Sequence, residues 1–267
     1  MRQLMFSLIL FIVPAVAGAQ EISSTPASVA FPGSLNMTVG NVTPTERGNV
    51  VSLTMLEQGV TVWHHKHTFV SGLAQLSVGR DTDHYAWNNR RPVTLGVRFS
   101  QVMSNSVLQL NVGESMVSDT TTSTVIKPVA YASYWAGWRH SLSGGTFRPR
   151  ALPGTFWITS GVVSGLEPHN WITSASFDQG AMVYEHGRTA LIPYTRFTAN
   201  TDTRGFTWNN RTSIDAGLKV RRAVMGGVVD AGVAARRQFE RLNGTSHTAG
   251  VAFVELWYGW NPRAIIR

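Results

Sequence analysis

The sequence predicts an all-β fold: an antiparallel transmembrane β-barrel of about 12 strands formed by an internal duplication. Three observations predict it. Apolar and polar residues alternate along most of the chain, no stretch has helical periodicity, and aromatic residues lie near the ends of the alternating segments. Alternation with a period of two is typical of half-buried strands. Membrane-spanning strands need about 9–11 residues, apolar toward lipid and polar inside, with aromatic girdles at both interfaces.

The alternation is clear in both halves of the chain. Residues 93–100 place Val93, Leu95 and Val97 on one face and Thr94 and Arg98 on the other. Residues 213–221 repeat this pattern, and turn-forming clusters such as residues 243–245 separate such segments. We therefore expect roughly six strands in each half, or about twelve in all.

The duplication is most visible in a ten-residue segment that occurs twice. Asp-Thr-Asp-His-Tyr-Ala-Trp-Asn-Asn-Arg at 81–90 corresponds to Asp-Thr-Arg-Gly-Phe-Thr-Trp-Asn-Asn-Arg at 202–211. The same offset aligns 57–65 with 178–186 and 31–38 with 152–159, and a shift of one residue aligns 129–138 with 251–260. Self-similarity at a fixed period constrains the whole architecture. The sequence predicts a first β repeat at 31–139, a linker at 140–151 and a second β repeat at 152–267, with both repeats in one barrel.

The N-terminus predicts export. Arg2 precedes an apolar run from Leu4 to Val16, and the small residues at 17–19 match a cleavage site. We expect a signal peptide at 1–19 and a flexible lead-in at 20–30. The apolar run is too short for a transmembrane helix. The sequence has no Cys, which argues against a disulfide-framed extracellular module.

The last alternating segment, residues 249–260, is amphipathic and rich in aromatic residues. Together with the aromatic residues near other strand ends, it resembles bacterial outer-membrane β-barrel proteins as a class. Those proteins usually end on an aromatic residue, whereas this chain continues through residues 261–267, and its basic balance is less usual for the class. The resemblance implies a bacterial outer-membrane location, with a periplasmic or secreted protein as the alternative. The residues expected in the girdles are Trp63, Trp87, Trp135, Trp138, Trp208, Trp257 and Trp260.

A second architecture fits the same alternation. Each repeat has about 110 residues, the size of a β-sandwich domain, so two tandem β-sandwiches would also explain strands with one apolar and one polar face. Their outer faces would carry the abundant Thr, Ser, Asn and Arg residues. The sequence leaves both architectures open.

The net charge of the full chain is +8. A basic balance favours polyanionic partners, and export makes nucleic acid the least suitable of them. The expected partners are outer-membrane lipid and an anionic polysaccharide or lipopolysaccharide; no nucleic acid and no cofactor are expected.

The repeated ten-residue segment lies between two strands and is a candidate ligand-binding site. Its Trp would stack on a sugar ring, its Asp and Asn residues would bond hydroxyl groups, and its Arg would hold an anion. A loop anchor explains the same residue types, because Asn-Asn tolerates left-handed backbone and Trp fixes a loop at an interface. The candidate binding residues are Asp81, Trp87, Asn88 and Arg90 in the first copy and Asp202, Trp208, Asn209 and Arg211 in the second.

Basic residues on the polar faces of strands predict a charged lumen. They would form a basic path for an acidic solute, or they would form an ion-pair network with Asp215, Asp230 and Glu255 that fills the barrel. The residues of the expected path are Arg98, Arg196, Lys219, Arg221 and Arg236.

Other chemistry is weakly supported by the sequence. His65 and His67 would share a strand face and could ligate a metal, but no third ligand is identifiable, so no metal site is expected. No Ser, His or Asp lies in a recognisable catalytic context. We therefore expect a non-enzymatic outer-membrane barrel that passes, anchors or binds an anionic or sugar-rich envelope component. The alternatives are an exported two-domain carbohydrate-binding β-sandwich protein and an outer-membrane lipid or lipopolysaccharide hydrolase.

Overall fold

The computed structural model describes residues 28–41, 48–84, 89–119, 124–142, 149–163, 169–261 and 263–265. The expected signal peptide and most of the lead-in lie outside these ranges. The described residues form strands almost throughout, and none of their helices is long and apolar enough to cross a membrane. The elements are β1 (Ser28–Ala30), β2 (Gly33–Asn41), β3 (Val51–His65), β4 (Thr68–Asp81), β5 (Arg90–Met103), β6 (Ser106–Asp119), β7 (Val125–Ser141), β8 (Ala151–Val162), β9 (Ile172–Gly180), β10 (Tyr184–His186), β11 (Thr189–Asp202), the short 3-10 helix η1 (Thr207–Asn209), β12 (Arg211–Val224), β13 (Gly227–Glu240), β14 (Thr245–Trp260) and β15 (Arg263–Ile265).

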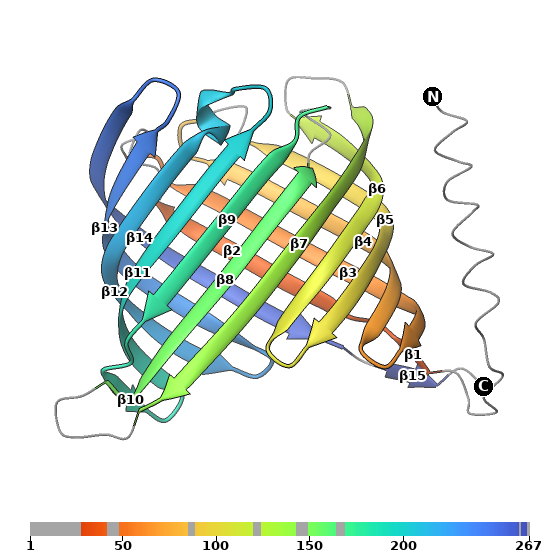
Figure 1. The fold of residues 1–267 in the computed structure, drawn as a ribbon, viewed down its shortest axis with the longest axis horizontal. Coiled ribbons are helices and arrows are strands. Elements are labelled where there is room, and N and C mark those ends of the chain that lie inside the picture. The colour runs from red at the N-terminus through yellow and green to blue at the C-terminus, as the bar shows by residue number, and fades with distance from the viewer. Residues whose placement is uncertain are drawn as a thin grey trace.

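The long strands form one closed antiparallel sheet (Figure 1). β14 pairs with β2 along 252–260 and 33–41, so the last long strand closes on the first. β9 and β10 both pair with β11 and share one position in the ring, which gives a barrel of 12 strands. β7 also pairs with β8 across the two predicted repeats. The tandem-sandwich alternative is therefore wrong, because the two halves share one sheet.

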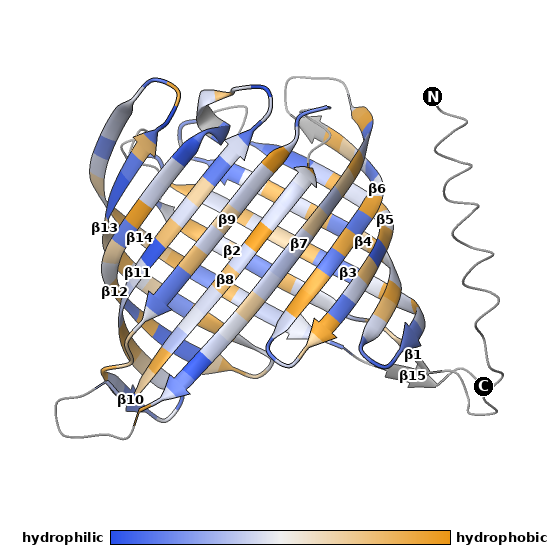
Figure 2. Ribbon diagram, viewed as in Figure 1, coloured by the Kyte–Doolittle hydropathy of each residue, from blue (hydrophilic) through white to orange (hydrophobic). Residues whose placement is uncertain are grey.

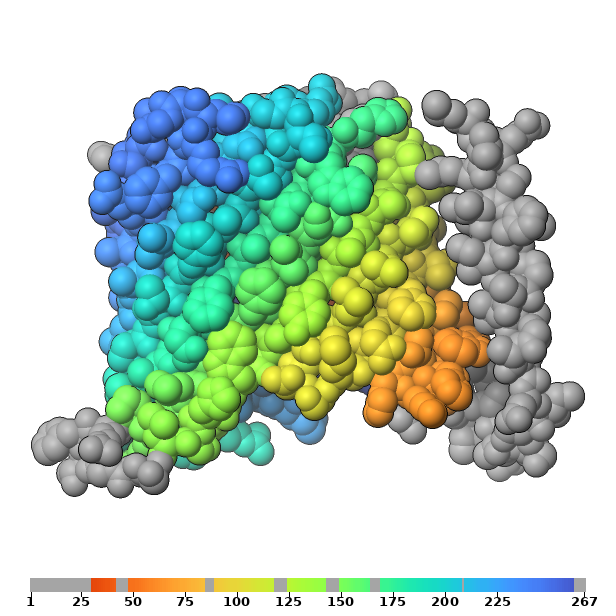
Figure 3. Space-filling model, viewed as in Figure 1, coloured from red at the N-terminus to blue at the C-terminus, as the bar shows by residue number. Residues whose placement is uncertain are grey.

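The register separates an outer face from an inner face. On β5 and β6, Leu95 and Val112 point outward and are 61% and 50% exposed, whereas Asn111 and Ser115 point inward and are 3% and 1% exposed. Figure 2 shows the resulting alternation of hydrophobic and hydrophilic residues along the strands, and Figure 3 shows side chains covering the outer wall. A closed barrel with an apolar exterior satisfies its backbone hydrogen bonds without water and faces lipid. The protein is an outer-membrane β-barrel, as the sequence predicted.

The two ends of the barrel differ. At one end lie β1, β15 and the tight turns at 66–67, 104–105 and 225–226 (lower end in Figure 1). The opposite end carries the connections 42–50, 82–89, 163–171 and 203–210. Outer-membrane barrels have short periplasmic turns and longer extracellular loops. We therefore assign the first end, here called the turn end, to the periplasm and the second, the loop end, to the outside.

The segments flanking the barrel pair with each other at the turn end. β1 pairs with β15 through residues 28–30 and 263–265. The last three residues of the expected lead-in are thus a strand, and the continuation past β14 is its partner. The connection 142–150 between β7 and β8 corresponds closely to the predicted linker.

The tryptophans do not all lie in outer girdles. The register places Trp63, Trp138 and Trp260 on the outer face. It places Trp135 and Trp257 on the inner face, so the girdle prediction is wrong for these two. Trp87 lies outside the described residues, and the structure does not describe the side chain of Trp208 in η1.

Two matching contacts join the halves at the turn end. The Trp138 indole donates to the side-chain oxygen of Gln179 at 3.1 Å, and the Trp260 indole donates to that of Gln58 at 3.1 Å. Each glutamine amide in turn donates to two backbone oxygens, those of Pro32 and Gly59 or of Pro153 and Gly180. We call these the Trp–Gln clasps. The two clasps recur at the offset that aligns the two predicted repeats.

Residues 31–139 expressed alone should fail to form a stable barrel. The fragment would leave β2 and β7 as unpaired edges, and unpaired backbone groups are costly in lipid and aggregation-prone in water. The full chain, folded in detergent, should migrate faster on gels before boiling than after, whereas the fragment should show no such shift. A soluble fragment with a cooperative unfolding transition would contradict this.

Candidate functional site

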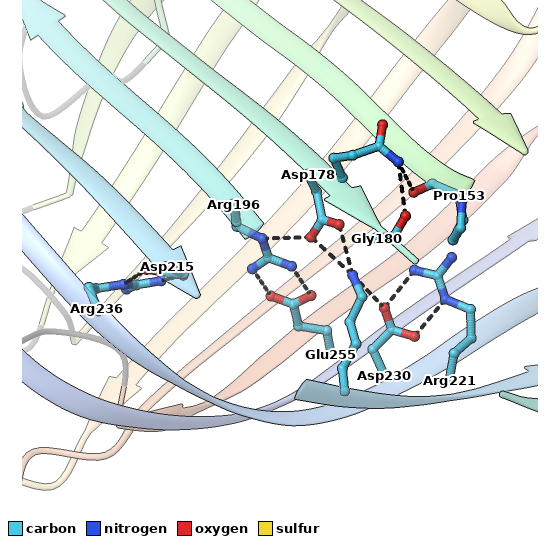
Figure 4. Close-up of polar contacts among 11 residues, drawn as sticks. Pro153, Asp178, Gly180, Arg196, Asp215, Arg221, Asp230, Arg236 and Glu255 are labelled. Atoms are coloured by element: carbon cyan, nitrogen blue, oxygen red, sulfur yellow. Dashed lines mark hydrogen bonds and ion pairs between the residues drawn. The ribbon is translucent and has the colours of Figure 1, made fainter. Parts of the chain in front are cut away.

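The inner wall carries a charged network on the second-half strands β9, β11, β12, β13 and β14 (Figure 4). Asp178 accepts from Lys219 Nζ at 3.0 Å through both oxygens and from Arg196 Nε at 3.1 Å. Arg196 also binds Glu255 with two bonds of 2.7 and 2.9 Å. Lys219 lies 3.6 Å from Asp230. The network thus joins all five strands through a chain of alternating charges.

Two further ion pairs use other inward charges of this half. Arg221 binds Asp230 with bonds of 2.8 and 2.6 Å. Arg236 binds Asp215 with two bonds of 2.6 Å. Paired, hydrogen-bonded geometry of this kind offsets the cost of removing charges from water.

The first-half wall has a single matching pair among its described residues. Arg98 donates to both oxygens of Glu57 at 3.0 and 2.8 Å and to the side-chain oxygen of Asn111 at 2.6 Å. Its other inward residues include Ser71, Gln75 and Ser115. This side of the lumen is therefore polar, and its described residues form fewer ion pairs than those of the second-half wall.

All five cations of the predicted basic path therefore face carboxylates: Arg98 with Glu57, Arg196 with Asp178 and Glu255, Lys219 with Asp178 and Asp230, Arg221 with Asp230, and Arg236 with Asp215. These pairs correspond to the ion-pair alternative, which named Asp215, Asp230 and Glu255. Asp178 and Glu57 were not singled out from the sequence. A period-two reading of 172–180 and 51–65 places them on inner faces and would have found them.

An apolar cluster packs against the network. Ile192 is fully buried, and Tyr194 meets Phe253 edge-on with ring centroids 6.0 Å apart. Lys219 Nζ lies 4.7 Å from the Tyr194 ring centre, a cation–π distance. The second-half wall is thus a packed layer that projects into the barrel.

Three tryptophans line the lumen toward the turn end. Trp135, Trp157 and Trp257 occupy inward positions and are 46%, 38% and 49% exposed. Trp135 and Trp157 are directly opposite each other on β7 and β8. The Trp135 ring lies over Gly137, and the Trp257 ring lies over Gly259, where a Cβ would come within 2.6 and 3.1 Å of the ring. A glycine two residues on therefore lets each ring lie along the wall. We call these three residues the luminal tryptophans.

Two buried donors on the inner wall have no hydrogen-bond partner within the described part of the chain. They are the Asn111 side-chain nitrogen and the Tyr194 hydroxyl. Buried polar groups are usually satisfied, so such donors commonly mark a position for water or a ligand.

The repeated Asp residues anchor loops at the loop end. Asp81 accepts from Asn49 and Asn89, and Asp202 accepts from Asn170, Asn209 and Asn210. The side-chain oxygen of each buried asparagine, Asn49 or Asn170, accepts from the backbone of the neighbouring loop. We call these two sets the rim clasps. Burial opposes ionisation of Asp202, but the bonds from Asn170, Asn209 and Asn210 outweigh it and hold the pKa of this loop-end carboxyl below its ordinary value.

The rim clasps favour the loop-anchor interpretation of the repeated segment over ligand binding. The Asp oxygens that would bond a sugar are occupied by loop amides. Arg90 and Arg211 begin β5 and β12. Trp87 and Asn88 lie outside the described residues, as do the contacts of the Trp208 side chain. Asn49 and Asn170 were missed, although they match at the same offset as the rest of the repeat.

The histidines near the first hairpin do not share a strand face. β3 ends at His65, and His67 lies in the turn, so the geometry expected of a ligand pair is wrong. His65 stacks on Trp63, and His64 stacks on Phe69. No group of three or more metal-ligating side chains occurs among the residues that the structure describes.

No protein family and no curated protein matches the sequence. Solved structures with a similar fold include the β domain of the Bordetella autotransporter BrkA, with 14% identity, a TM-score of 0.43 and coverage of 88% of this chain and 100% of that one. They also include the transport unit of the Escherichia coli autotransporter AIDA-I, with 12% identity, a TM-score of 0.35 and coverage of 90% and 93%. Pseudomonas aeruginosa OpdK has 8% identity, a TM-score of 0.31 and coverage of 88% and 99%. Similarities this weak say nothing of activity, and the assignment to outer-membrane barrels follows from the closed sheet and its apolar outer face.

Asp178→Asn should destabilise the barrel strongly. The variant leaves the buried Lys219 with a weakened counter-charge, and breaking a buried pair costs roughly 3–5 kcal/mol. The temperature at which the folded band converts to the unfolded band on gels should fall. Glu185→Gln is the matched control: its pair with Arg139 is 32% and 52% exposed, so the change should cost at most about 1 kcal/mol. Equal shifts for both variants would contradict a structural role for the network.

Asn170→Ala should loosen the loop end without opening the barrel. It removes the bond to Asp202 and leaves a loop N–H without its acceptor, which costs about 1–3 kcal/mol. Limited proteolysis of intact cells should cut near residues 203–210 faster, while the heat-modifiable band persists. Loss of the folded band would show that the rim clasp is needed for the barrel itself.

Proposed function

We propose that this barrel is a non-enzymatic outer-membrane protein that binds or passes a sugar-rich envelope component through its lumen. The luminal tryptophans are the observation that carries the proposal. They expose ring faces on inner-wall positions that are otherwise mostly polar, and flat aromatic surfaces stack on the apolar faces of sugar rings.

The electrostatics of the wall favour a neutral solute over an anionic one. Each cation of the expected basic path faces a carboxylate, so the lumen offers little unpaired positive potential at those positions.

The proposal is tested by calorimetric titration of the detergent-folded protein with a neutral glucose oligomer and with a sulfated oligosaccharide of equal length. The neutral oligomer should bind more tightly. Trp135→Ala and Trp257→Ala should each weaken it about fivefold, equivalent to about 1 kcal/mol of stacking.

The control is Trp63→Ala, which removes a tryptophan of the outer face that takes no part in the Trp–Gln clasps and should leave sugar binding unchanged. All variants are first checked for the heat-modifiable band. Failure of both oligomers to bind, or equal weakening by Trp63→Ala, would overturn the proposal.

A further inference from the structure

The lipid-facing wall over β12, β13, β14 and β2 is hollowed. Two adjoining depressions of about 550 and 640 Å³ share Leu218, Val233 and Ala252 among their lining residues. The lining is almost wholly apolar. An apolar groove on a lipid-facing wall offers more contact to an acyl chain than a smooth wall does.

The strand register explains the shape of this groove. Ala216, Ala235 and Gly250 are direct cross-strand neighbours and form a row of small outward residues. The next row toward the turn end is Leu218, Val233 and Ala252. The small residues of the first row form the bottom of the groove, and the larger side chains of Leu218 and Val233 form its edge.

A cation lies directly above the small row. Arg237 occupies the outward position next to Ala235 on β13, with Ile214 and Thr248 as its cross-strand neighbours. It is exposed, and its guanidinium stacks on the Phe239 ring at 5.0 Å. It lies three residues from the loop end of β13, the end assigned to the outside. No carboxylate of the described residues forms an ion pair with it.

The corresponding wall of the first half lacks all of these features. At the repeat offset, the row Ala216, Ala235 and Gly250 corresponds to Leu95, Glu114 and Pro128, which are also cross-strand neighbours. Arg237 corresponds to Met116. The barrel fold therefore does not by itself require the groove or its cation. The equivalent row of the first half has larger side chains and carries the carboxylate of Glu114.

We propose that this groove binds a phosphorylated glycolipid of the outer leaflet, with one acyl chain along the small row and a phosphate at Arg237. Arginine binds phosphate oxygens with two parallel hydrogen bonds. Stacking on Phe239 holds the guanidinium beside the small row, and the apolar rows below it contact the chain. This inference does not depend on the proposed luminal function.

The test measures lipid retained by the detergent-folded protein in native mass spectrometry, with diphosphorylated lipid A, phosphatidylglycerol and inorganic phosphate added in separate arms. Lipid A should bind best, and inorganic phosphate alone should not be retained. Arg237→Ala should weaken lipid A binding about tenfold, equivalent to about 1.4 kcal/mol, and Arg237→Lys should retain part of it. Ala235→Leu fills the floor and should weaken binding without changing the charge.

Arg91→Ala is the matched control, because Arg91 is an exposed outward arginine near the loop end of β5, on the first-half wall. It should bind lipid A as the unsubstituted protein does. Equal retention by the Arg237→Ala and unsubstituted proteins would overturn the proposal. So would a lipid-free dimer that Ala235→Leu dissociates, since a second copy would then occupy the groove.

Discussion

The pairing of β14 with β2 is the constraint on which the rest of the structure depends. Lipid offers no hydrogen-bond partners, so a sheet can cross the membrane only when its last strand closes on its first. Closure fixes the register around the ring. The register decides which of every two successive residues along a strand faces lipid. The charged network, the luminal tryptophans and the outer groove all follow from that single assignment of faces. A slip by one residue on any strand would exchange its two faces.

The inner and outer faces solve different physical problems. The outer face needs apolar side chains in contact with lipid, and Val, Leu and Ile provide most of them. The inner face must accommodate Arg, Lys, Asp and Glu away from bulk water, and it does so by pairing them. Arg196 and Asp178 pair on neighbouring strands, whereas Lys219 reaches Asp178 across β11 and Arg196 on β11 reaches Glu255 on β14. The pairs therefore also tie together strands that are not hydrogen-bonded to each other. Among the described residues of the first-half wall, Arg98 and Glu57 form such a pair, and the two walls of the lumen differ in packing as well as charge.

The sequence predicted the barrel, its strand number and its location, because alternation is a local property that survives in every strand. It also predicted which cations face inward, since Lys219 and Arg221 lie on one side of an alternating segment. The ion-pair alternative named Asp215, Asp230 and Glu255 as partners, but Asp178 and Glu57 were not identified from the sequence. Asp178 meets Lys219 across β11, and such contacts depend on strand order and stagger rather than on spacing. Trp135 and Trp257 were predicted on the wrong face for a related reason: each is followed three residues later by an outward tryptophan, and only the register tells the two apart.

The rim clasps could have been predicted from the sequence, because Asn49 and Asn170 repeat at the same offset as the segments they hold.

The Trp–Gln clasps have a consequence for how the two halves relate as chemical units. Each clasp takes its donor from the last strand of one half and its acceptor from the first hairpin of the other. Each half therefore donates one of these bonds and accepts the other at the two boundaries between the halves. Neither bond requires a covalent link between the halves. The connection at 142–150 sets the effective concentration at which the halves meet. A six-strand chain that carried one clasp tryptophan and one clasp glutamine could form both clasps by pairing with an identical copy. In a single chain that holds both halves, by contrast, each wall can diverge in sequence. The lipid-facing rows that carry Arg237 in one half and Glu114 in the other are an instance of that freedom.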